Sequence, residues 1–281
     1  MTTDTITRKR PTPLNALVLT QSSVERLRVQ LGNRVGALGR GVDEAEQPVP
    51  GVYGELFALL EQMEDRIEQE YEAALRAYPI YGAWLSHVKG IGTALSAQML
   101  AMLIVPEPGM NVGVWYKTGG LVPEWHEDQQ AWRLPRPRKV RCAQCQGTAF
   151  ELITDTEDRV CKGCETVLPE DAGKLTYYKY LRRCLHNVAT SFVRVGGYYR
   201  EVYNRTKARL QTQHAGDKAW PVHRIDDVAR WIMIKLFLSH LFSKWAELEG
   251  FTAPRPYALE ILGHDQGGYI APPEWDGKTK M

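Results

Sequence analysis

The chain has 281 residues, of which 44% are hydrophobic, and a formal net charge of +2. This length allows one large domain or two modest ones, and the apolar content is enough for a globular core. The chain lacks the run of about eighteen apolar residues that a membrane span requires, so we expect a cytoplasmic protein with no membrane partner. Lys9 and Arg10 are not followed by the apolar stretch of a targeting signal.

The charges are distributed unevenly along the chain. Residues 43–72 hold ten acids and one base, a local charge of −9, whereas residues 174–209 hold nine bases and one acid, a local charge of +8. This separation predicts one face that attracts polyanions and another that repels them. The alternative, that the two segments neutralise each other within the fold, stays open.

The N-terminal part of the chain is predicted to be helical after a disordered tail at residues 1–18. A capping box that begins at Ser22 predicts a helix over residues 22–38, and a second apolar stripe predicts a helix over residues 52–77. Both stripes are close to a heptad repeat. They predict an antiparallel helical hairpin over residues 19–78, or a coiled-coil contact through which the chain forms a homodimer.

A glycine hairpin is the main feature of residues 79–132. Short helices are predicted over residues 80–88 and 93–104, and the segment between them has the form of a helix-hairpin-helix motif. In that motif the glycines let the backbone approach a phosphate, and the amides that begin the second helix donate to it. An ordinary glycine turn between two helices is the alternative. The predicted phosphate-binding residues are Lys89, Gly90, Ile91, Gly92 and Thr93.

Residues 133–173 combine a basic linker with two C-x2-C pairs that are separated by fifteen residues. This spacing is typical of a tetrahedral zinc site of the ribbon type, with short strands between the two pairs. Four thiolates would fill the coordination shell, so we expect the Zn(2+) to be structural. Two disulfides would suit a secreted chain, which the N-terminus does not indicate. The predicted ligands are Cys142, Cys145, Cys161 and Cys164, and the predicted strands are residues 149–154 and 159–160.

Residues 174–250 are predicted to form a basic C-terminal helical bundle, followed by a tail at residues 251–281. The last helix is apolar on nearly every side, which predicts the central core helix. Nine bases are interleaved with six tyrosines, a pattern that suits phosphate contacts and base stacking, although we expect about half of the tyrosines to pack inward. The predicted helices are residues 175–195, 198–213 and 221–248. The predicted nucleic-acid-binding cations are Arg136, Arg138, Lys139, Lys179, Arg182, Arg183, Arg194, Arg200 and Lys207.

Three short motifs occur in a fixed order after the acidic helices. They are Gly90-Ile91-Gly92, Gly120-Leu121-Val122-Pro123 and Leu181-Arg182-Arg183-Cys184-Leu185. This order resembles the C-terminal helix-hairpin-helix domain of the DEDD-type insertion-sequence transposases, which are guided by a structured RNA. The resemblance covers residues 52–248 and implies a helical domain that binds nucleic acid.

The chain also departs from that family. The helical stripes before residue 78 leave no place for the family's RuvC-like nuclease domain with its four carboxylates. The family uses a nucleophilic serine after the Gly-Leu-x-Pro element, whereas this chain has no serine between Ser96 and Ser191. The resemblance therefore implies binding without transposase chemistry.

We therefore expect a mainly α protein, built from a helical hairpin and a helix-hairpin-helix domain with a small inserted β zinc ribbon. Its expected function is to bind the backbone of DNA or structured RNA as a transposase relative that is not catalytic by itself. One alternative is a recombinase or nuclease component with an unrecognised active site, which would bring acidic residues together in a cleft. The other is a structural interaction protein of a phage or mobile element. The residues that the nuclease alternative would bring together are Glu201, His223, Asp226 and Asp227.

Overall fold

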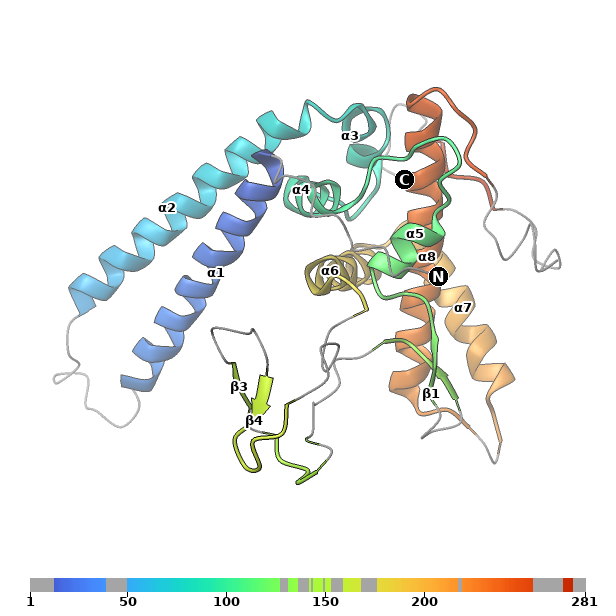
Figure 1. Cartoon of the computed structure of the whole chain (residues 1–281). Helices are drawn as coiled ribbons and strands as arrows, with labels where there is room; N and C mark the ends of the chain where they lie inside the picture. The colour runs from blue at the N-terminus through green and yellow to red at the C-terminus, as the bar shows by residue number, and fades with distance from the viewer. Residues whose placement is uncertain are drawn as a thin grey trace. The chain divides into compact units, whose positions relative to one another are not determined.

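The protein is mainly α-helical, as its sequence predicts (Figure 1). The structure, a computed structural model, describes residues 13–38, 50–126, 131–135, 142, 144–148, 150–152, 159–167, 176–216, 219–254 and 270–274. The chain forms two compact units, which we treat separately. The helical unit comprises Met1–Trp115 and Arg183–Met281, and the inserted unit comprises Tyr116–Arg182.

Apart from the start of α1 and the short helix α5, which the sequence does not predict, the helices lie close to their predicted places, and α7 has the predicted bounds. The helices are α1 (Pro13–Leu38), α2 (Pro50–Leu75), α3 (Pro79–Ala83), α4 (Thr93–Met102), α5 (Gly113–Thr118), α6 (Lys179–Val195), α7 (Tyr198–Gln213) and α8 (Val222–Leu248), with a 3₁₀ turn at Leu85–His87. The strands are β1 (Glu124–His126), β2 (Ala131–Arg133), β3 (Phe150–Leu152) and β4 (Arg159–Cys161). Strand β1 pairs with β2, and β3 pairs with β4, both antiparallel.

Helix α1 begins at Pro13, nine residues before the predicted capping box, so the prediction of a disordered tail is wrong for residues 13–18. The first turns are held because Leu14 and Val18 are buried. Ser22 lies inside the helix. Its neighbour Ser23 donates its hydroxyl to the Leu19 carbonyl four residues back, at 3.0 Å, as serines inside helices do.

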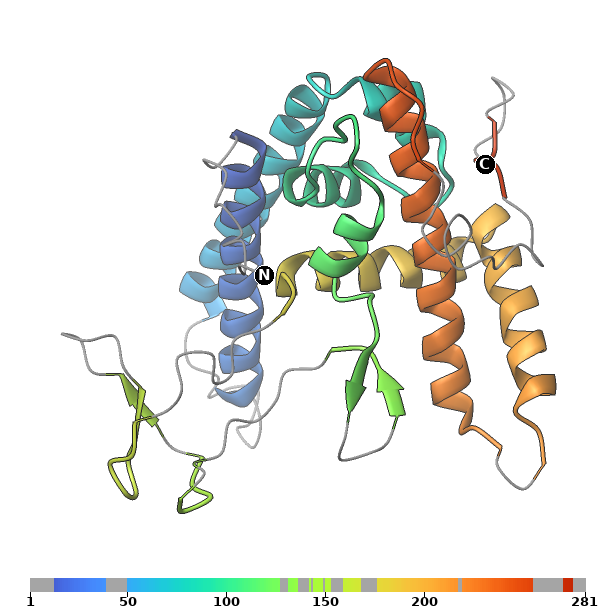
Figure 2. The same ribbon diagram turned by 45° about the vertical axis from the view of Figure 1, so that its right-hand side comes forward.

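Helices α1 and α2 lie side by side and antiparallel in both ribbon views (Figures 1 and 2), and their contacts agree. Arg28 Nε donates to Glu64 Oε1 at 3.0 Å, and Tyr71 donates its hydroxyl to Gln21 at 2.6 Å. Both helices also contact α4. The predicted helical hairpin is therefore formed within one chain.

Helix α8 is the central core helix of the helical unit, as its all-round apolar character predicts. Phe237 shows why: its ring stacks at 6.1 Å on Trp84 and meets Phe192 and Tyr199 edge-on at 5.1 and 5.2 Å. These partners come from three different segments, so α8 is covered on several sides. Helix α7 runs antiparallel beside α8 in both ribbon views (Figures 1 and 2).

The described part of the C-terminal tail, residues 270–274, is hydrogen-bonded to this core. Trp84 Nε1 donates to the Pro273 carbonyl at 3.1 Å, and His240 Nε2 lies 3.0 Å from the Ile270 carbonyl. Two buried polar groups of the core thus find their partners in the tail. Among the described residues, none of the helices combines the length and the apolar character that a membrane crossing requires.

Residues 103–118, whose sequence suggests irregular structure, include the short helix α5. Helix α5 is capped by Asn111, whose side-chain oxygen accepts from the Gly113 amide at 2.8 Å. Trp115 is buried, with its indole N–H donating to the Ile104 carbonyl at 3.0 Å and its ring 5.0 Å from Phe242. Asn111 is the sequence signal that identifies this short helix.

Candidate metal centre and nucleic-acid interface

The four predicted metal ligands gather at one point of the inserted unit, and their sulfur atoms all lie within 4.8 Å of one another. Cys142 Sγ lies 3.3 Å from Cys164 Sγ, and Cys145 Sγ lies 3.4 Å from Cys161 Sγ. None of the four is in a disulfide. In a tetrahedral site with metal–sulfur bonds of about 2.3 Å, the sulfur atoms lie about 3.8 Å apart. This value falls between the shortest sulfur–sulfur distance of the cluster, 3.3 Å, and its upper limit of 4.8 Å.

The two cysteine pairs sit on turns of the same construction. In the first turn the amide of Gln146 donates to the Cys142 carbonyl at 2.9 Å, and in the second the amide of Glu165 donates to the Cys161 carbonyl at 2.8 Å. Both donors are non-glycine residues with positive φ, +58° and +56°. Two matching turns with this uncommon conformation hold each pair of thiols towards the same point.

The surroundings of the thiols favour their charged form at one position. Thr166 Oγ1 lies 3.2 Å from Cys164 Sγ, and the hydrogen bonds that Cys164 makes with the hydroxyl and the amide of Thr166 lower the pKa of Cys164 to about 6. Cys142 and Cys161 are buried. The donor set fits a metal ion, because four soft sulfur ligands gathered at one point are typical of Zn(2+).

The glycine hairpin is a tight turn between the 3₁₀ turn and α4. The Ile91 amide donates to the Val88 carbonyl at 3.1 Å, and Gly90 at its corner has φ +93°, a conformation that favours glycine. Gly92 precedes α4 and is exposed, and a Cβ there would meet nothing within 4 Å. The helix's own hydrogen bonds begin with Ser96 N to Gly92 O, so the amides of the first turn have no acceptor within α4.

The hairpin is docked on α6. Ser191 donates its hydroxyl to the Gly90 carbonyl at 2.6 Å, and a Cβ at Gly90 would lie 3.2 Å from the Phe192 ring. Gly90 therefore serves the packing of the hairpin, and Gly92 leaves the start of α4 open. Lys89 is exposed beside Gly90, and Arg194 is exposed one turn after Ser191 on α6. Of the remaining hairpin residues, Ile91 is buried and Thr93 is half-buried at the start of α4.

Two of the predicted phosphate-binding cations have structural partners instead. Arg182 Nη1 donates to the Gly120 carbonyl at 2.6 Å, and its guanidinium lies 5.0 Å from the Tyr177 ring. This contact joins two of the short motifs, within the inserted unit. Lys207 Nζ lies 3.0 Å from Asp226 Oδ1. Neither cation is free to pair with a phosphate without giving up these contacts.

The other described cations of the predicted set are exposed. Arg183 approaches Glu25 at 3.9 Å but keeps 66% of its side chain exposed, so this pair is weak. Lys179 lies over the Tyr180 ring at 5.1 Å. Arg194 and Arg200 are exposed. The linker residues Arg136, Arg138 and Lys139 lie outside the described residues.

The tyrosines divide as expected. Tyr177, Tyr199 and Tyr203 are buried, and the other three of the six are half-buried. Burial of about half of them confirms that the interleaved pattern serves packing as well as the surface. The buried rings of α7 contact α8 and α6, as the stacking of Tyr199 on Phe192 at 4.7 Å illustrates.

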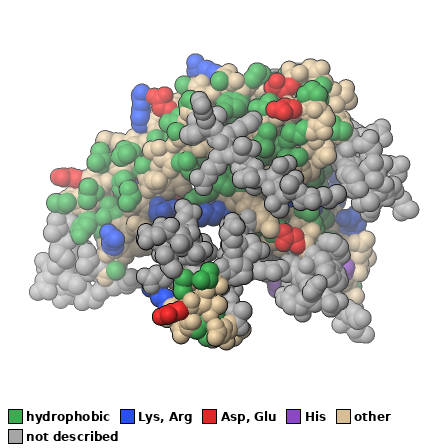
Figure 3. Space-filling model, in the orientation of Figure 1, with side chains coloured by type: hydrophobic (Ala, Val, Ile, Leu, Met, Phe, Trp, Pro, Cys, Tyr) green, Lys and Arg blue, Asp and Glu red, His purple; other side chains and the backbone are tan. Residues whose placement is uncertain are grey.

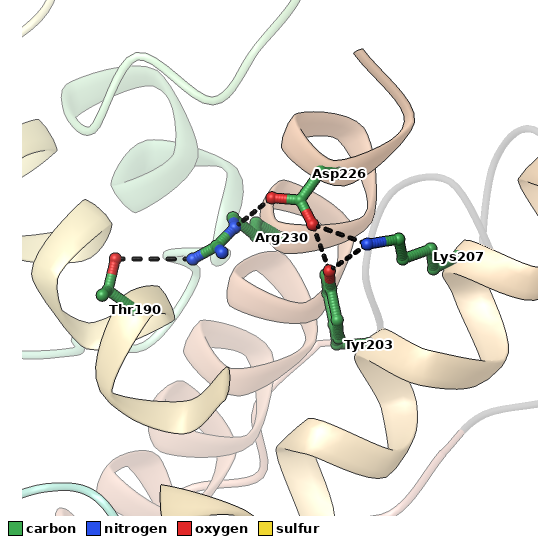
Figure 4. A network of polar contacts seen from close by, with 5 residues as sticks. All are labelled: Thr190, Tyr203, Lys207, Asp226 and Arg230. Atoms are coloured by element: carbon green, nitrogen blue, oxygen red, sulfur yellow. Dashed lines mark hydrogen bonds and ion pairs between the residues drawn. The ribbon is translucent and has the colours of Figure 1, made fainter. Parts of the chain in front are cut away.

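Asp226 is the centre of a polar network between α7 and α8 (Figure 4). Arg230 Nε donates to one carboxylate oxygen at 2.6 Å, and Lys207 and Tyr203 donate to the other. Burial alone would raise the pKa of Asp226, but the hydrogen bonds from Tyr203, Arg230 and Lys207 outweigh it and lower the pKa to about 2. Sequence reasoning missed Arg230, although it stands four residues after Asp226 on a helix.

We expect Asp226→Asn to destabilise the helical unit by about 1–3 kcal/mol, because Lys207 and Arg230 would lose their charged partner in a partly buried position. The neighbouring Asp227 is exposed. Asp227→Asn is therefore the matched control and should change the free energy of unfolding by less than about 0.5 kcal/mol. Urea unfolding followed by circular dichroism measures both. Equal changes in the free energy of unfolding for the two substitutions would show that the Asp226 network does not contribute to stability.

The acidic residues of the nuclease alternative do not form a metal-binding group. The carboxylate of Asp226 is occupied by two cations and a phenol, and Glu201, His223 and Asp227 are exposed. Within the described part of the chain, the cysteine cluster is the one group of three or more potential ligands close enough to hold a metal ion. No family model matches this chain, and no curated protein matches it either.

Proposed function

We propose that this protein binds a structural Zn(2+) ion through Cys142, Cys145, Cys161 and Cys164 and contacts the backbone of DNA or structured RNA through its glycine hairpin. It is a relative of mobile-element transposases that is not catalytic by itself. The observation that carries the nucleic-acid part is the open start of α4 beside exposed cations. Amides without an intrahelical acceptor and a helix dipole favour an anion at this place.

The contacts of the hairpin support this proposal. Gly90 is held on α6 by Ser191, so the turn is rigid before any ligand arrives, while Gly92 stays open. Arg183 and Arg194 are eleven residues apart, which places them on the same side of α6 about 16 Å apart. With Lys89 and Arg200, the helical unit offers four exposed cations of the predicted set.

The test is the salt dependence of binding, measured by fluorescence anisotropy with labelled duplex DNA, single-stranded DNA and a folded RNA hairpin. If these four cations each neutralise one phosphate of a duplex, log K falls with log salt at a slope of about −3.6. A fivefold rise in salt would then weaken binding about three-hundredfold. Absence of binding at low salt, or binding that does not depend on salt, would refute the nucleic-acid proposal and leave the metal site standing.

Gly92→Leu is expected to weaken nucleic-acid binding about tenfold or more, because the side chain would cover amides that donate charge-assisted hydrogen bonds. Stability should change little, since the position is exposed and its φ of −102° suits any residue. Gly36→Leu, at an open and exposed position on α1, is the matched control.

Gly90→Ala should instead destabilise the protein, because Gly90 has a positive φ and an added Cβ would contact Phe192. If Gly92→Leu binds like the parent, the hairpin is only a structural turn.

A further inference from the structure

Helix α2 carries two apolar stripes, and only one of them faces α1. The inner stripe includes Phe57, Ile67 and Tyr71, and it packs on α1 as described. The second stripe, which we call the outer seam, lies about a quarter turn away around the helix. Its members are Val52, Leu56, Leu59 and Met63, which are 55%, 41%, 53% and 42% exposed. Figure 3 shows hydrophobic side chains gathered over the arm that α1 and α2 form.

The outer seam has the spacing of a coiled-coil interface. Its members are separated by four, three and four residues, which is the alternation of heptad core positions. The next position along the seam is Arg66, whose side chain is 72% exposed and pairs with Glu70 at 2.6 Å. The seam is thus a block of three turns that ends at an ion pair, about 16 Å long.

The spacing of the seam, four, three and four residues, is the same from either end, which suits a second copy of itself. With a two-fold axis between Leu56 and Leu59, an antiparallel copy would place its Met63 opposite Val52 and its Leu59 opposite Leu56. All four layers are then apolar. A two-fold interface requires this kind of self-complementary patch.

The charges nearest the seam favour the antiparallel orientation over the parallel one. Glu55 flanks the first half of the seam and Arg66 ends the second half. In an antiparallel copy the two lie six residues, or about 9 Å, apart along the axis, compared with eleven residues in a parallel copy. A parallel copy would instead place Glu55 beside Glu55 and Arg66 beside Arg66. The exposed acids Glu61, Asp65 and Glu68 stand 9, 13 and 16 residues after Val52. At about 100° per residue, all three lie on the side of α2 opposite the seam, so they do not face the second copy.

We propose that the outer seam of α2 is a self-association surface on which a second copy of this chain docks antiparallel. Four half-exposed side chains from each copy bury less than the roughly 1,200 Å² of a stable interface. The dimer is therefore weak and depends on concentration. This inference is independent of the nucleic-acid proposal, and it specifies which stripe and which orientation a coiled-coil contact uses.

Cysteine cross-linking of the full zinc-loaded chain tests the orientation. In the antiparallel dimer, position 52 of one copy faces position 63 of the other, within the distance of about 7 Å that a disulfide needs. The double variant Val52→Cys/Met63→Cys should therefore give a covalent species of about twice the 31.9 kDa chain mass under mild oxidation. Each single variant should give no more than the parent, because its own two copies lie about 16 Å apart.

Leu59→Asp in the double-cysteine background should abolish the cross-link and keep the protein monomeric in analytical ultracentrifugation over a concentration series. Val29→Asp, at another exposed apolar position on the arm, is the matched control and should leave the cross-link intact. Thermal unfolding should be unchanged by both, since both positions are exposed. A cross-link in the single Val52→Cys variant, a cross-link that survives Leu59→Asp, or a parent chain that stays monomeric throughout would each overturn the proposal.

Discussion

Replacing Cys161 with serine is expected to abolish stoichiometric metal binding and to unfold the cysteine turns while the helices stay folded. Cys161 is buried beside Cys145, and a serine hydroxyl is a much poorer ligand than a thiolate at neutral pH. Structural zinc contributes about 10–16 kcal/mol of binding free energy in small zinc domains, so its loss removes the main stabilising term of these turns. Metal analysis by mass spectrometry should give one zinc per parent chain and none in the variant.

In Cys161→Ser the circular dichroism signal of the helices should be unchanged. The helical unit has its own apolar core around α8, and the cysteine turns are not part of it. Cys184→Ala is the control for the loss of a thiol. Cys184 is buried in α6 outside the cluster, so this variant should keep its zinc and lose only packing energy. Full zinc content in Cys161→Ser, or none in the parent under reducing conditions, would refute the assignment of the site.

The second large effect is expected on the pH dependence of stability. His240 is buried in α8, where Tyr199 Oη lies 3.0 Å from its Nδ1 and the Ile270 carbonyl lies 3.0 Å from its Nε2. The neutral ring satisfies both contacts by accepting from Tyr199 and donating to Ile270. Burial lowers the pKa of His240 from 6.5 to about 4, against a smaller opposing effect of the Ile270 hydrogen bond.

The folded pKa lies below the unfolded one, so the unfolded chain takes up its proton first as the pH falls. The stability that neutral His240 contributes is complete above about pH 6.5 and is lost progressively towards about pH 4. At about 1.4 kcal/mol for each pKa unit, the full loss is on the order of 3 kcal/mol. Urea unfolding at a series of pH values should show this loss in the parent and not in His240→Gln.

We expect a second loss of stability at lower pH, which comes from Asp226. Its lower pH range distinguishes it from the loss that His240 causes. Its pKa is lowered to about 2 from 3.8, so its contribution is lost only as the pH falls from about 3.8 towards 2. His240→Gln should keep this lower step. A parent protein with constant stability between about pH 6.5 and 4 would show that His240 is not buried as a neutral ring.

The cysteine cluster could be predicted from the sequence because its constraints are local. Each pair closes its own turn within a few residues, and the gap between the pairs is the length of a short strand pair. The helices were predicted for a similar reason, since the apolar period along each segment reports which side is buried. The sequence predicts too late a start for α1 because Ser22 has the features of a cap, whereas Leu14 and Val18 extend the buried stripe beyond it.

The helical class, the place of α8 in the core and the clustering of four thiols all follow from local patterns in the sequence. Which basic residues take part in packing depends on the tertiary structure, since Arg182 contacts Gly120 and Lys207 contacts Asp226 across distant segments of the chain. The tertiary structure also separated the roles of Gly90 and Gly92, because the neighbour that fills the space beside Gly90 is Phe192, about a hundred residues away. A local pattern records which side of a helix is apolar, but the identity of a partner from another helix depends on how the helices pack.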